Sequence, residues 1–562
     1  MAATAPVFAA MGVREIRAGL ASKDFSAREI AESSLARVRA LDGATHAFLE
    51  TTEQLALRQA AALDAAVAAG TLDACGPLAG VPVAFKDNMN LTGTHTTCSS
   101  QMLANYVSPY TATCVARTID AGGIPLGKLN MDEFAFGSST ETSAFGSTRN
   151  PWDLSRVPGG SSGGSAAAVG AGLAAITLGS DTGGSIRQPG SFCGAVAVKP
   201  TYGVVSRYGV VAFGSSLDQV GPFTRSVEDA AFALNAIAGR DVLDCTSQDL
   251  DVDFTANLAE GVKGMRIGVV PAFMEAQGLT DEVKAKVEEA VEHLRALGAD
   301  IVEVELPNAQ AAMSAYYVLG PCEAFSNLAR FDSVRYGYCD PGHKDLGGQY
   351  EASRAKGFGP EARRRIMLGS YLLSAGVYDT YYYPAQQVRT LITQDYARAY
   401  EQVDCIVAPV SPRTAFTFGE VSDPTDMYLS DMFTISINIA GNGGMSLPVG
   451  LGAQTQLPVG VQLISPQFKD QNMLRVAAAL ETVYGPAPVA PAFAPGQPYP
   501  EGSMADIPDA ADATPGVDLP GLCMDREPSG GVHQASSAAK RGLSERLDAP
   551  GGLPFQVEKA GE

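Results

Sequence analysis

Two glycine-serine loops, separated by a short run of small residues, constrain the fold of this chain more than any other feature. The loops are residues 159–165 and 181–185, and the residues between them are small and largely apolar from 166 to 178. Glycine is unfavourable inside regular elements, so this density predicts backbone that takes unusual dihedral angles or approaches a ligand closely. The intervening run predicts a tightly packed helix and strand. We therefore expect a site built around the two loops.

The glycine loops alone leave more than one kind of site open. A nucleotide-binding loop of the Walker kind requires Lys-Ser or Lys-Thr after its last glycine, and a dinucleotide-binding loop requires Gly-x-Gly-x-x-Gly after a strand. Neither pattern occurs in residues 159–189. Phosphate binding of another kind and simple structural turns remain alternatives to a catalytic site. If the site is catalytic, its chemistry falls to the serines, which are poor nucleophiles without a nearby base.

A base for these serines has to come from elsewhere in the chain. None of the five histidines lies in a recognisable Ser-His-Asp motif: His46, His95, His293, His343 and His533. The other possibility is a lysine kept neutral by burial, because removing an ammonium group from water lowers its pKa. Lys86 fits, since it ends the apolar, strand-like run 80–85 and precedes turn residues. A solvated charge at the end of a strand is the competing interpretation.

Three ordered motifs carry a resemblance to a known family. They are Gly-Val-Pro-Val-Ala-Phe-Lys-Asp-Asn at 80–88, Gly-Gly-Ser-Ser-Gly-Gly-Ser at 159–165 and Asp-Thr-Gly-Gly-Ser-Ile-Arg-Gln-Pro at 181–189. In these motifs the chain resembles the amidase signature family. The resemblance implies an α/β fold, with a single large domain in which a central mixed β-sheet is covered by helices on both faces.

The resemblance also implies a Ser-cis-Ser-Lys triad. Ser185 is the expected nucleophile, Ser161 the relay for its proton, and Lys86 the final base. The peptide bond between Gly160 and Ser161 is expected to be cis.

Other groups of the same two loops are expected to assist the triad. The backbone N–H groups expected to form an oxyanion hole are those of Thr182, Gly183, Gly184 and Ser185. The side chains expected to support the triad are Ser162, Asp181 and Arg187. Without the resemblance, these three residues are equally well interpreted as ordinary stabilisers of a loop.

Longer segments resemble one branch of the family, the A subunits of tRNA-dependent amidotransferases. These segments are 127–152, 199–209, 216–225, 316–332 and 358–369. The resemblance implies that the chain releases ammonia from glutamine. A B subunit would then use that ammonia, with ATP and Mg, to convert misacylated Glu-tRNA(Gln), or Asp-tRNA(Asn), to the correctly charged tRNA. A small C subunit would complete a heterotrimer, and no cofactor or metal is expected in this chain.

Two other functions stay open at this point. A free-standing amidase acting on small amides is the alternative among enzymes. A non-catalytic binding scaffold is the alternative of a different class, and the presence of Lys86, Ser161 and Ser185 together argues against it.

The amidotransferase resemblance implies groups that bind the two charged ends of glutamine. An arginine fork suits the carboxylate, and an acidic side chain suits the ammonium. The residues expected in these roles are Arg364 for the carboxylate and Asp431 for the ammonium, with Tyr316 lining the pocket. The register of the arginine is uncertain by one residue among Arg363, Arg364 and Arg365, and a triple arginine is otherwise typical of a solvated helix face.

The rest of the chain is predicted to form one large folded part and a tail. Helices are expected within 13–70, including one that begins with a capping box at Ser26 and Glu29, and a strand-helix-strand unit is expected at 265–306. The folded domain is predicted to span 1–487. Residues 488–562 are rich in Pro, Ala and Gly, which predicts a mostly disordered tail with a short helix near 538–547.

Composition limits the compartment in which the protein is expected and the partners that it is expected to bind. The net charge of −21 argues against a nucleic-acid surface on this chain, so tRNA is expected to be held mainly by a partner. The nine cysteines are scattered without a Cys-x-x-Cys pair, which favours reduced thiols and no structural zinc. The sequence contains neither a signal-peptide pattern nor an apolar run of about 18 residues, so we expect a cytoplasmic protein without a membrane span.

Overall fold

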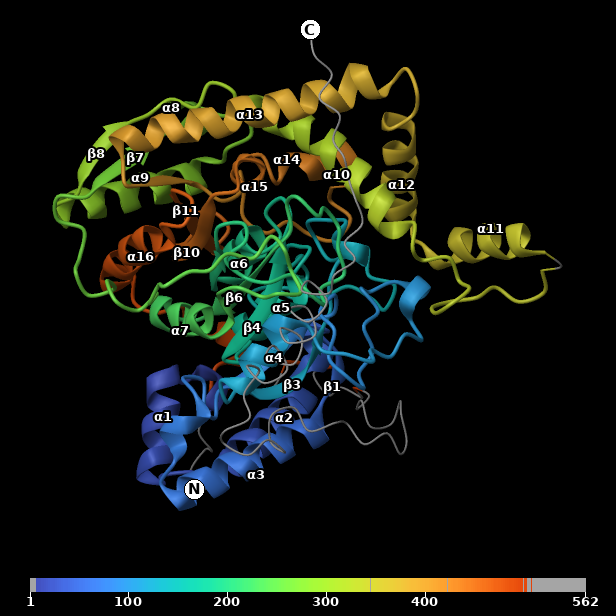
Figure 1. Ribbon diagram of the computed structural model, residues 1–562. Coiled ribbons are helices and arrows are strands. Elements are labelled where there is room, and N and C mark those ends of the chain that lie inside the picture. The colour runs from blue at the N-terminus through green and yellow to red at the C-terminus, as the bar shows by residue number, and fades with distance from the viewer. Residues whose placement is uncertain (1–6, 344, 422, 499, 503–506, 508–562) are drawn as a thin grey trace, which may run out of the picture. The chain divides into compact units, whose positions relative to one another are not determined.

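One mixed β-sheet organises the residues that the computed structural model describes, which are 7–343, 345–421, 423–498, 500–502 and 507. Its strands are β1 (Phe48–Thr51), β2 (Pro82–Lys86), β3 (Ile124–Leu129), β4 (Ile176–Asp181), β5 (Val196–Lys199), β6 (Gln219–Thr224), β7 (Arg266–Val269), β8 (Asp300–Glu303), β9 (Cys405–Pro409), β10 (Gly443–Leu451) and β11 (Pro458–Ser465). The eleven strands lie in the order β1-β3-β2-β4-β6-β5-β10-β11-β9-β7-β8 (Figure 1).

Parallel pairs occur in two parts of this sheet. β3, β2 and β4 run parallel to one another near one end, and β9, β7 and β8 do so at the other end. The strands between them pair in antiparallel fashion. Neighbouring parallel strands point their carboxyl ends to the same edge, and so the ends of β2 and β4 lie close together. This places Lys86 beside the loop that follows Asp181.

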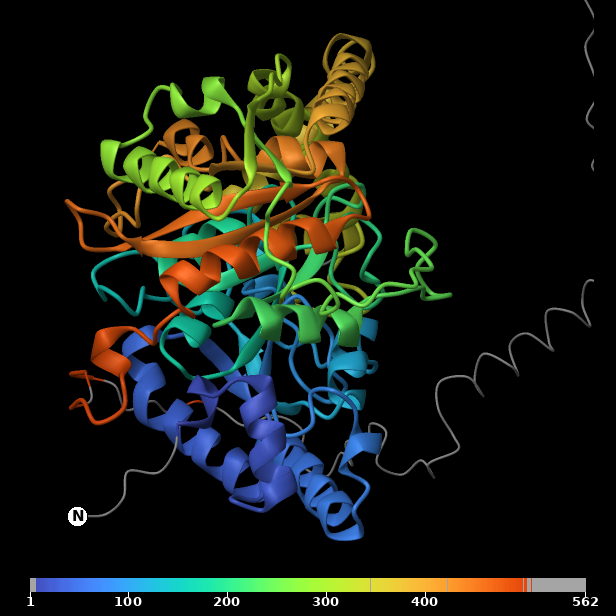
Figure 2. The same ribbon diagram turned by 90° about the vertical axis from the view of Figure 1, so that its left-hand side faces the viewer.

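Helices connect the strands and cover the sheet. They are α1 (Val13–Ser22), α2 (Ala27–Thr45), α3 (Glu53–Ala69), α4 (Thr113–Asp120), α5 (Gly163–Gly170), α6 (Arg187–Cys193), α7 (Val227–Ile237), α8 (Pro271–Met274), α9 (Asp281–Ala296), α10 (Ala312–Leu328), α11 (Leu346–Gly357), α12 (Pro360–Leu372), α13 (Tyr378–Gln402), α14 (Pro424–Leu429), α15 (Ile435–Ala440) and α16 (Asp470–Tyr484). In Figure 2, α7, α16 and α9 lie on the side of the sheet that faces the viewer, where α16 contacts both other helices.

Side-chain alternation along β11 shows that the opposite face is covered as well. Gln462 accepts a hydrogen bond from Arg187 of α6. A Cβ atom on Gly460, two residues earlier, would lie 2.8 Å from the hydroxyl oxygen of Ser191, also in α6. Successive residues of a strand point to opposite faces, so Leu463 points away from α6, and α16 packs on β11 from that side. The predicted α/β fold, a mixed sheet with helices on both faces, is confirmed.

Most elements expected from the sequence are present. Ser26 and Glu29 form the predicted capping box of α2, and β7, α9 and β8 form the predicted strand-helix-strand unit. One element differs from the expectation, because the sequence pattern of 13–70 predicts helices alone. The four-residue strand β1 lies between α2 and α3 and pairs antiparallel with β3. A strand this short carries too little alternation to be recognised.

The folded part continues a little past the predicted boundary at residue 487. The Ala490 amide donates to the Gly170 carbonyl, and Phe493 is buried. All described residues belong to one compact unit. The predicted helix near 538–547 and most of the predicted tail lie outside the described residues, so the disorder of that tail stays a prediction.

Two further findings concern these same residues. None of the described helices is both long and apolar enough to cross a membrane. Every cysteine in the described part of the chain is a free thiol.

Candidate active site

Lys86 lies at the carboxyl end of β2 and is fully buried. Its Nζ donates to the hydroxyl oxygen of Ser161 at 2.7 Å and to that of Ser162 at 2.9 Å. It also contacts the hydroxyl and the carbonyl oxygen of Ser180, at 3.0 and 3.3 Å. Burial lowers the pKa of Lys86 to about 7, although the nearby carboxylates of Asp132 and Asp181 act in the opposite direction. An amine with this pKa is available as a neutral base near pH 7.

The first glycine loop brings Ser161 to this amine. The loop leads from residue 159 into α5, and the peptide bond between Gly160 and Ser161 is cis, as the resemblance implied. The position tolerates no side chain on Gly160, because a Cβ atom there would lie 2.0 Å from Oδ2 of Asp132. The Asp132 amide donates to the Ser161 carbonyl at 3.1 Å. Asp132 therefore fixes the loop from two sides.

Ser185 lies on the second glycine loop, between β4 and α6. The Ser162 amide donates to the Ser185 carbonyl at 3.2 Å, which ties the two loops together. No hydrogen bond joins the Ser185 hydroxyl to Ser161 among the described residues. Ser185 is 9% exposed, whereas Ser161 and Lys86 are each 0% exposed. Of the three expected triad residues, Ser185 is thus the one that a molecule entering from solvent reaches.

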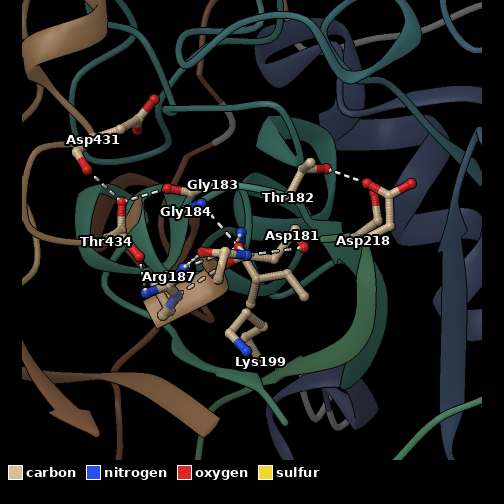
Figure 3. Close-up of polar contacts among 12 residues, drawn as sticks. Asp181, Thr182, Gly183, Gly184, Arg187, Lys199, Asp218, Asp431 and Thr434 are labelled. Atoms are coloured by element: carbon tan, nitrogen blue, oxygen red, sulfur yellow. Dashed lines mark hydrogen bonds and ion pairs between the residues drawn. The ribbon is translucent and has the colours of Figure 1, made fainter. Parts of the chain in front are cut away.

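The second loop offers fewer free amides than expected. The Gly184 amide donates to Oδ1 of Asp181 at 2.8 Å, so it is committed within the loop (Figure 3). The amides of Thr182, Gly183 and Ser185 have no hydrogen-bond partner among the described residues. These three donors are the ones that remain for an oxyanion, and the expectation for Gly184 does not fit the structure.

Asp181 and Arg187 form a buried ion pair beneath this loop (Figure 3). Arg187 donates from Nε to Oδ2 of Asp181 and from Nη2 to Oδ1, each at 3.0 Å. Burial alone would raise the pKa of Asp181, but Arg187, Lys199 and Asn438 together lower it to about 2. Arg187 also donates to the Thr434 carbonyl at 3.0 Å. The pair therefore holds the loop against α15 and its preceding turn.

The outer side of the loop is anchored too (Figure 3). The Thr182 hydroxyl donates to Oδ1 of Asp218 at 2.6 Å, and the Thr434 hydroxyl donates to the Gly183 carbonyl at 2.6 Å. These bonds fix two successive residues of the loop, and with the Gly184 bond to Asp181 they restrict the orientation of its amides.

Lys199 is a second buried lysine whose pKa burial lowers to about 7. Its Nζ donates to the carbonyl oxygens of Pro200 and Asn442. Because it contacts no serine hydroxyl, it has no proton to accept from the serines, and Lys86 is the better candidate for the base.

A cavity of about 450 Å³ is lined by residues of α12, α14 and the segment 133–142. Its lining residue Ser139 lies against the first loop, since a Cβ atom on Gly160 would be 2.7 Å from the Ser139 amide nitrogen. Its lining includes both Arg364 and Arg365. The Arg364 side chain is 49% exposed, whereas that of Arg365 is 5% exposed. The inward-facing arginine is therefore Arg365, one residue after Arg364 and within the register of Arg363 to Arg365 that the sequence left open.

Helical periodicity contained a signal for this register. The buried positions of α12 are Ala362, Arg365, Gly369 and Leu372, which lie on one face of a helix. The apolar members of this set place residue 365 inward and residue 364 outward.

Asp431 lies between the cavity and the second loop. It accepts a hydrogen bond from the hydroxyl of Ser138, a cavity residue, at 2.7 Å. A Cβ atom on Gly184 would lie 3.4 Å from Oδ1 of Asp431. Burial raises the pKa of Asp431 to about 7. A cationic group that enters beside this carboxylate would favour its ionised form.

Tyr316 of α10 lies against the same loop. A Cβ atom on Gly183 would be 2.9 Å from its hydroxyl oxygen. The ring of Tyr316 packs edge-on against Phe213. Tyr316 is thus placed to form one wall beside the free Gly183 amide.

Sequence reasoning missed Asp132 and Ser180. The Asp132 carboxylate accepts the Thr140 amide and the Thr142 hydroxyl, each at 2.9 Å, and lies close enough to Lys86 to favour its ammonium form. Asp132 lies in the segment 127–152, which carries the resemblance, but nothing in the sequence indicates its role. Ser180 carries no signal of its own, since it is one of several polar residues in a short buried strand.

Metal coordination finds no support in the described part of the chain, where no three His, Cys, Asp or Glu side chains are grouped to hold an ion.

The site has the features of a serine amidohydrolase, and comparison with known proteins gives its family. The family model described as Amidase matches residues 29–474, and the chain belongs to the amidase family.

Curated relatives define the branch. The chain is 52% identical over 470 residues to the A subunit of glutamyl-tRNA(Gln) amidotransferase from Synechococcus sp. (strain JA-3-3Ab), covering 84% of this chain and 91% of the relative. It is 53% identical over 471 residues to the protein of the same name from Gloeobacter violaceus (strain ATCC 29082 / PCC 7421), covering 84% of this chain and 96% of that relative.

Solved structures agree with the fold. The crystal structure of the A subunit of glutamyl-tRNA(Gln) amidotransferase from Thermotoga maritima superposes with a TM-score of 0.70 at 40% identity, covering 90% of this chain and 98% of that chain. The native peptide amidase from Stenotrophomonas maltophilia superposes with a TM-score of 0.73 at 30% identity, covering 86% of this chain and 99% of that one.

Proposed function

We propose that this chain is the glutaminase subunit of a tRNA-dependent amidotransferase, and that it releases ammonia from the side-chain amide of glutamine. The observation that carries the proposal is the contact of Lys86 with Ser161. A fully buried amine whose pKa is lowered to about 7 lies 2.7 Å from a serine hydroxyl. Identity of about half the residues with curated amidotransferase A subunits supports this substrate over other amides.

The reaction begins with attack of the Ser185 hydroxyl oxygen on the amide carbon of glutamine. Ser161 accepts the proton of Ser185 and passes its own to neutral Lys86. No hydrogen bond joins the two serine hydroxyls among the described residues; in this proposal it forms when substrate binds, because catalytic hydrogen bonds often tighten only in the complex. The free amides of Thr182, Gly183 and Ser185 receive the negative charge that develops on the carbonyl oxygen.

Collapse of the tetrahedral intermediate breaks the carbon–nitrogen bond. The proton held by Lys86 returns through Ser161 to the leaving nitrogen, so ammonia departs and a glutamyl ester stays on Ser185. Water then attacks the ester with the same groups as base, which releases glutamate and restores the free hydroxyl.

Glutamine is recognised in this proposal by its charged ends. Arg365 binds the α-carboxylate, replacing the neighbouring Arg364 in that role, and Asp431 binds the α-ammonium. Tyr316 lines the pocket between them. Binding of both charged groups fixes the position of the α-carbon, and the length of the glutamine side chain then determines where its amide lies, which explains a preference for glutamine over simple amides.

The partners belong to the same proposal. A B subunit holds the misacylated Glu-tRNA(Gln), or Asp-tRNA(Asn), and uses ATP and Mg to activate its carboxyl group for the ammonia released here. A C subunit completes a heterotrimer, and the assembly works in the cytoplasm. Support comes from the names of the relatives and from the net charge of −21, which suits a chain that leaves RNA binding to a partner.

The test is ammonia release from glutamine by the purified chain and by its Ser185→Ala variant, each alone and with candidate B and C subunits. The proposal predicts activity that depends on Ser185 and increases when the partners, ATP and misacylated tRNA are added. If the chain alone hydrolyses small amides faster than glutamine and does not respond to the partners, it is a free-standing amidase. Full activity of Ser185→Ala would overturn the assignment of the nucleophile.

A further inference from the structure

The guanidinium group of Arg365 is held in one place by contacts from three helices. Glu361, one turn earlier in α12, accepts from Arg365 Nε at 2.7 Å. The guanidinium carbon lies 4.8 Å from the ring centre of Tyr317 in α10 and 4.7 Å from that of Tyr428 in α14. Tyr317 and Tyr428 stack on each other with ring centres 3.9 Å apart. The guanidinium carbon is nearly equidistant from the centres of the two stacked rings, so it lies beside the edge of the stack, where the rings restrict its movement.

Glu361 is itself fixed by two further groups. The hydroxyl of Tyr428 donates to Glu361 Oε1, the same oxygen that accepts from Arg365, at 3.1 Å. Arg364 pairs with the other oxygen, Oε2, from the outer side of the helix. Both carboxylate oxygens are therefore occupied, and the orientation of Glu361 is determined.

These contacts use one side of the Arg365 guanidinium and leave the other available. Nε is bonded to Glu361, while Nη1 and Nη2 have no hydrogen-bond partner among the described residues. Arg365 and Glu361 both line the cavity of about 450 Å³. A pair of parallel N–H donors in a fixed plane is the arrangement that binds a carboxylate in bidentate fashion.

Tyr428 also links the contacts of Arg365 to the position of Asp431. It lies three residues before Asp431, and the Asp431 amide donates to its carbonyl at 3.1 Å. The same short segment therefore carries a contact to Arg365 and the carboxylate expected to bind an ammonium. A shift of this segment would therefore change the contact to Arg365 and move the carboxylate of Asp431.

We infer that Glu361 and Tyr428 are positioning residues, which hold Arg365 in the plane and orientation required to bind the α-carboxylate of the substrate. The inference rests on the proposed function, because it assigns the ligand of Arg365. Neither residue contacts the amide or the serines in this account. Their effect is on substrate affinity and on discrimination in favour of amides that carry an α-carboxylate.

A binding experiment tests the inference without turnover. In the Ser185→Ala background, the affinity for L-glutamine is measured by calorimetry for the parent, Glu361→Gln and Tyr428→Phe. Each change removes one charge-assisted or hydroxyl contact and keeps the size of the side chain, so we expect the dissociation constant to increase about tenfold for Glu361→Gln, equivalent to about 1.4 kcal/mol, and several-fold for Tyr428→Phe. Tyr371→Phe is the matched control, since Tyr371 lies on the same helix and is 58% exposed.

A kinetic comparison separates positioning from a merely structural role. With Ser185 present, Glu361→Gln is expected to raise KM for glutamine about tenfold while kcat changes less than about twofold. For 4-aminobutanamide, which lacks the α-carboxylate, kcat/KM should stay the same in parent and variant. Glu361→Asp, which keeps the charge, should recover part of the affinity.

The outcomes are distinct. Equal losses for glutamine and 4-aminobutanamide, or a loss of kcat at unchanged KM, would overturn the inference, as would unchanged glutamine affinity in both variants. Suppose that glutamine affinity in the Ser185→Ala background depends on Glu361 as predicted, but that the chain with no substitution releases no ammonia. The inference then stands and the proposed function fails.

Discussion

Lowering the pH below 7 should switch off glutamine hydrolysis by protonating Lys86. The base must be neutral to accept the serine proton, and burial places the pKa of Lys86 at about 7. With that value, about one lysine in eleven is neutral at pH 6 and about ten in eleven at pH 8, so kcat should be about tenfold lower at pH 6. The direction follows from the sign of the shift, since activity is gained as pH increases through the lowered pKa.

Asp431 adds a second effect of pH, which appears in KM and not in kcat. Its pKa is raised to about 7 by burial, and only its ionised form attracts the ammonium of glutamine. Below pH 7, KM should therefore increase as well, and kcat/KM should fall by up to about a hundredfold per pH unit because two groups must be deprotonated. Saturating glutamine removes the Asp431 contribution and leaves that of Lys86.

The assay is the initial rate of ammonia release over about pH 5.5 to 9 at constant ionic strength, with glutamine varied at each pH. The account predicts that kcat increases with pH, with the midpoint of the increase near pH 7. A kcat that still increases about tenfold per pH unit up to pH 9, as the ordinary lysine pKa of about 10.4 would give, would refute it. So would a kcat that is constant down to the lowest pH, because the base would then not titrate where the structure places it.

Three substitutions test the supporting groups. Asp132→Asn removes a negative charge that favours the ammonium form of Lys86, so the midpoint of the kcat limb should move to lower pH; a midpoint that is unchanged or higher would contradict this. Arg187→Met leaves a buried carboxylate without its cation and should lower the free energy of unfolding by about 3–5 kcal/mol in chemical denaturation, and a change within about 0.5 kcal/mol would contradict the structural role. Gly160→Ala places a Cβ atom 2.0 Å from a carboxylate oxygen and should abolish activity, whereas Gly347→Ala, on the exposed face of α11, should leave activity unchanged; comparable activity in both variants would show that the loop has room to adjust.

The sequence was sufficient to predict the elements that carry the chemistry. Lys86 ends an apolar strand, and Ser161 and Ser185 lie in glycine loops, so local composition already indicated where backbone must turn closely around a site. The mixed sheet followed from the family resemblance. The positions of Lys86, Ser161 and Ser185 depend on short stretches of chain, which a sequence displays directly, whereas their roles came, like the sheet, from the resemblance.

Contacts between distant segments could not be predicted in the same way. The commitment of the Gly184 amide to Asp181 depends on the conformation of one turn, and the choice of Arg365 over Arg364 depends on how α12 is rotated about its axis. The rotation was in principle readable from the buried periodicity of that helix. The role of Asp132 was not, since its contacts with the first glycine loop arise only in the folded chain.

The most direct test of the central claim is to identify the covalent intermediate. The protein is mixed with glutamine and, in parallel, with glutamate γ-methyl ester, quenched in acid within the first turnover, and analysed by peptide mass spectrometry. The account predicts one added glutamyl group on the peptide that contains Ser185, absent from Ser185→Ala and formed more slowly when Lys86 is protonated at low pH. A glutamyl group on another residue, or undiminished ammonia release by Ser185→Ala, would contradict it.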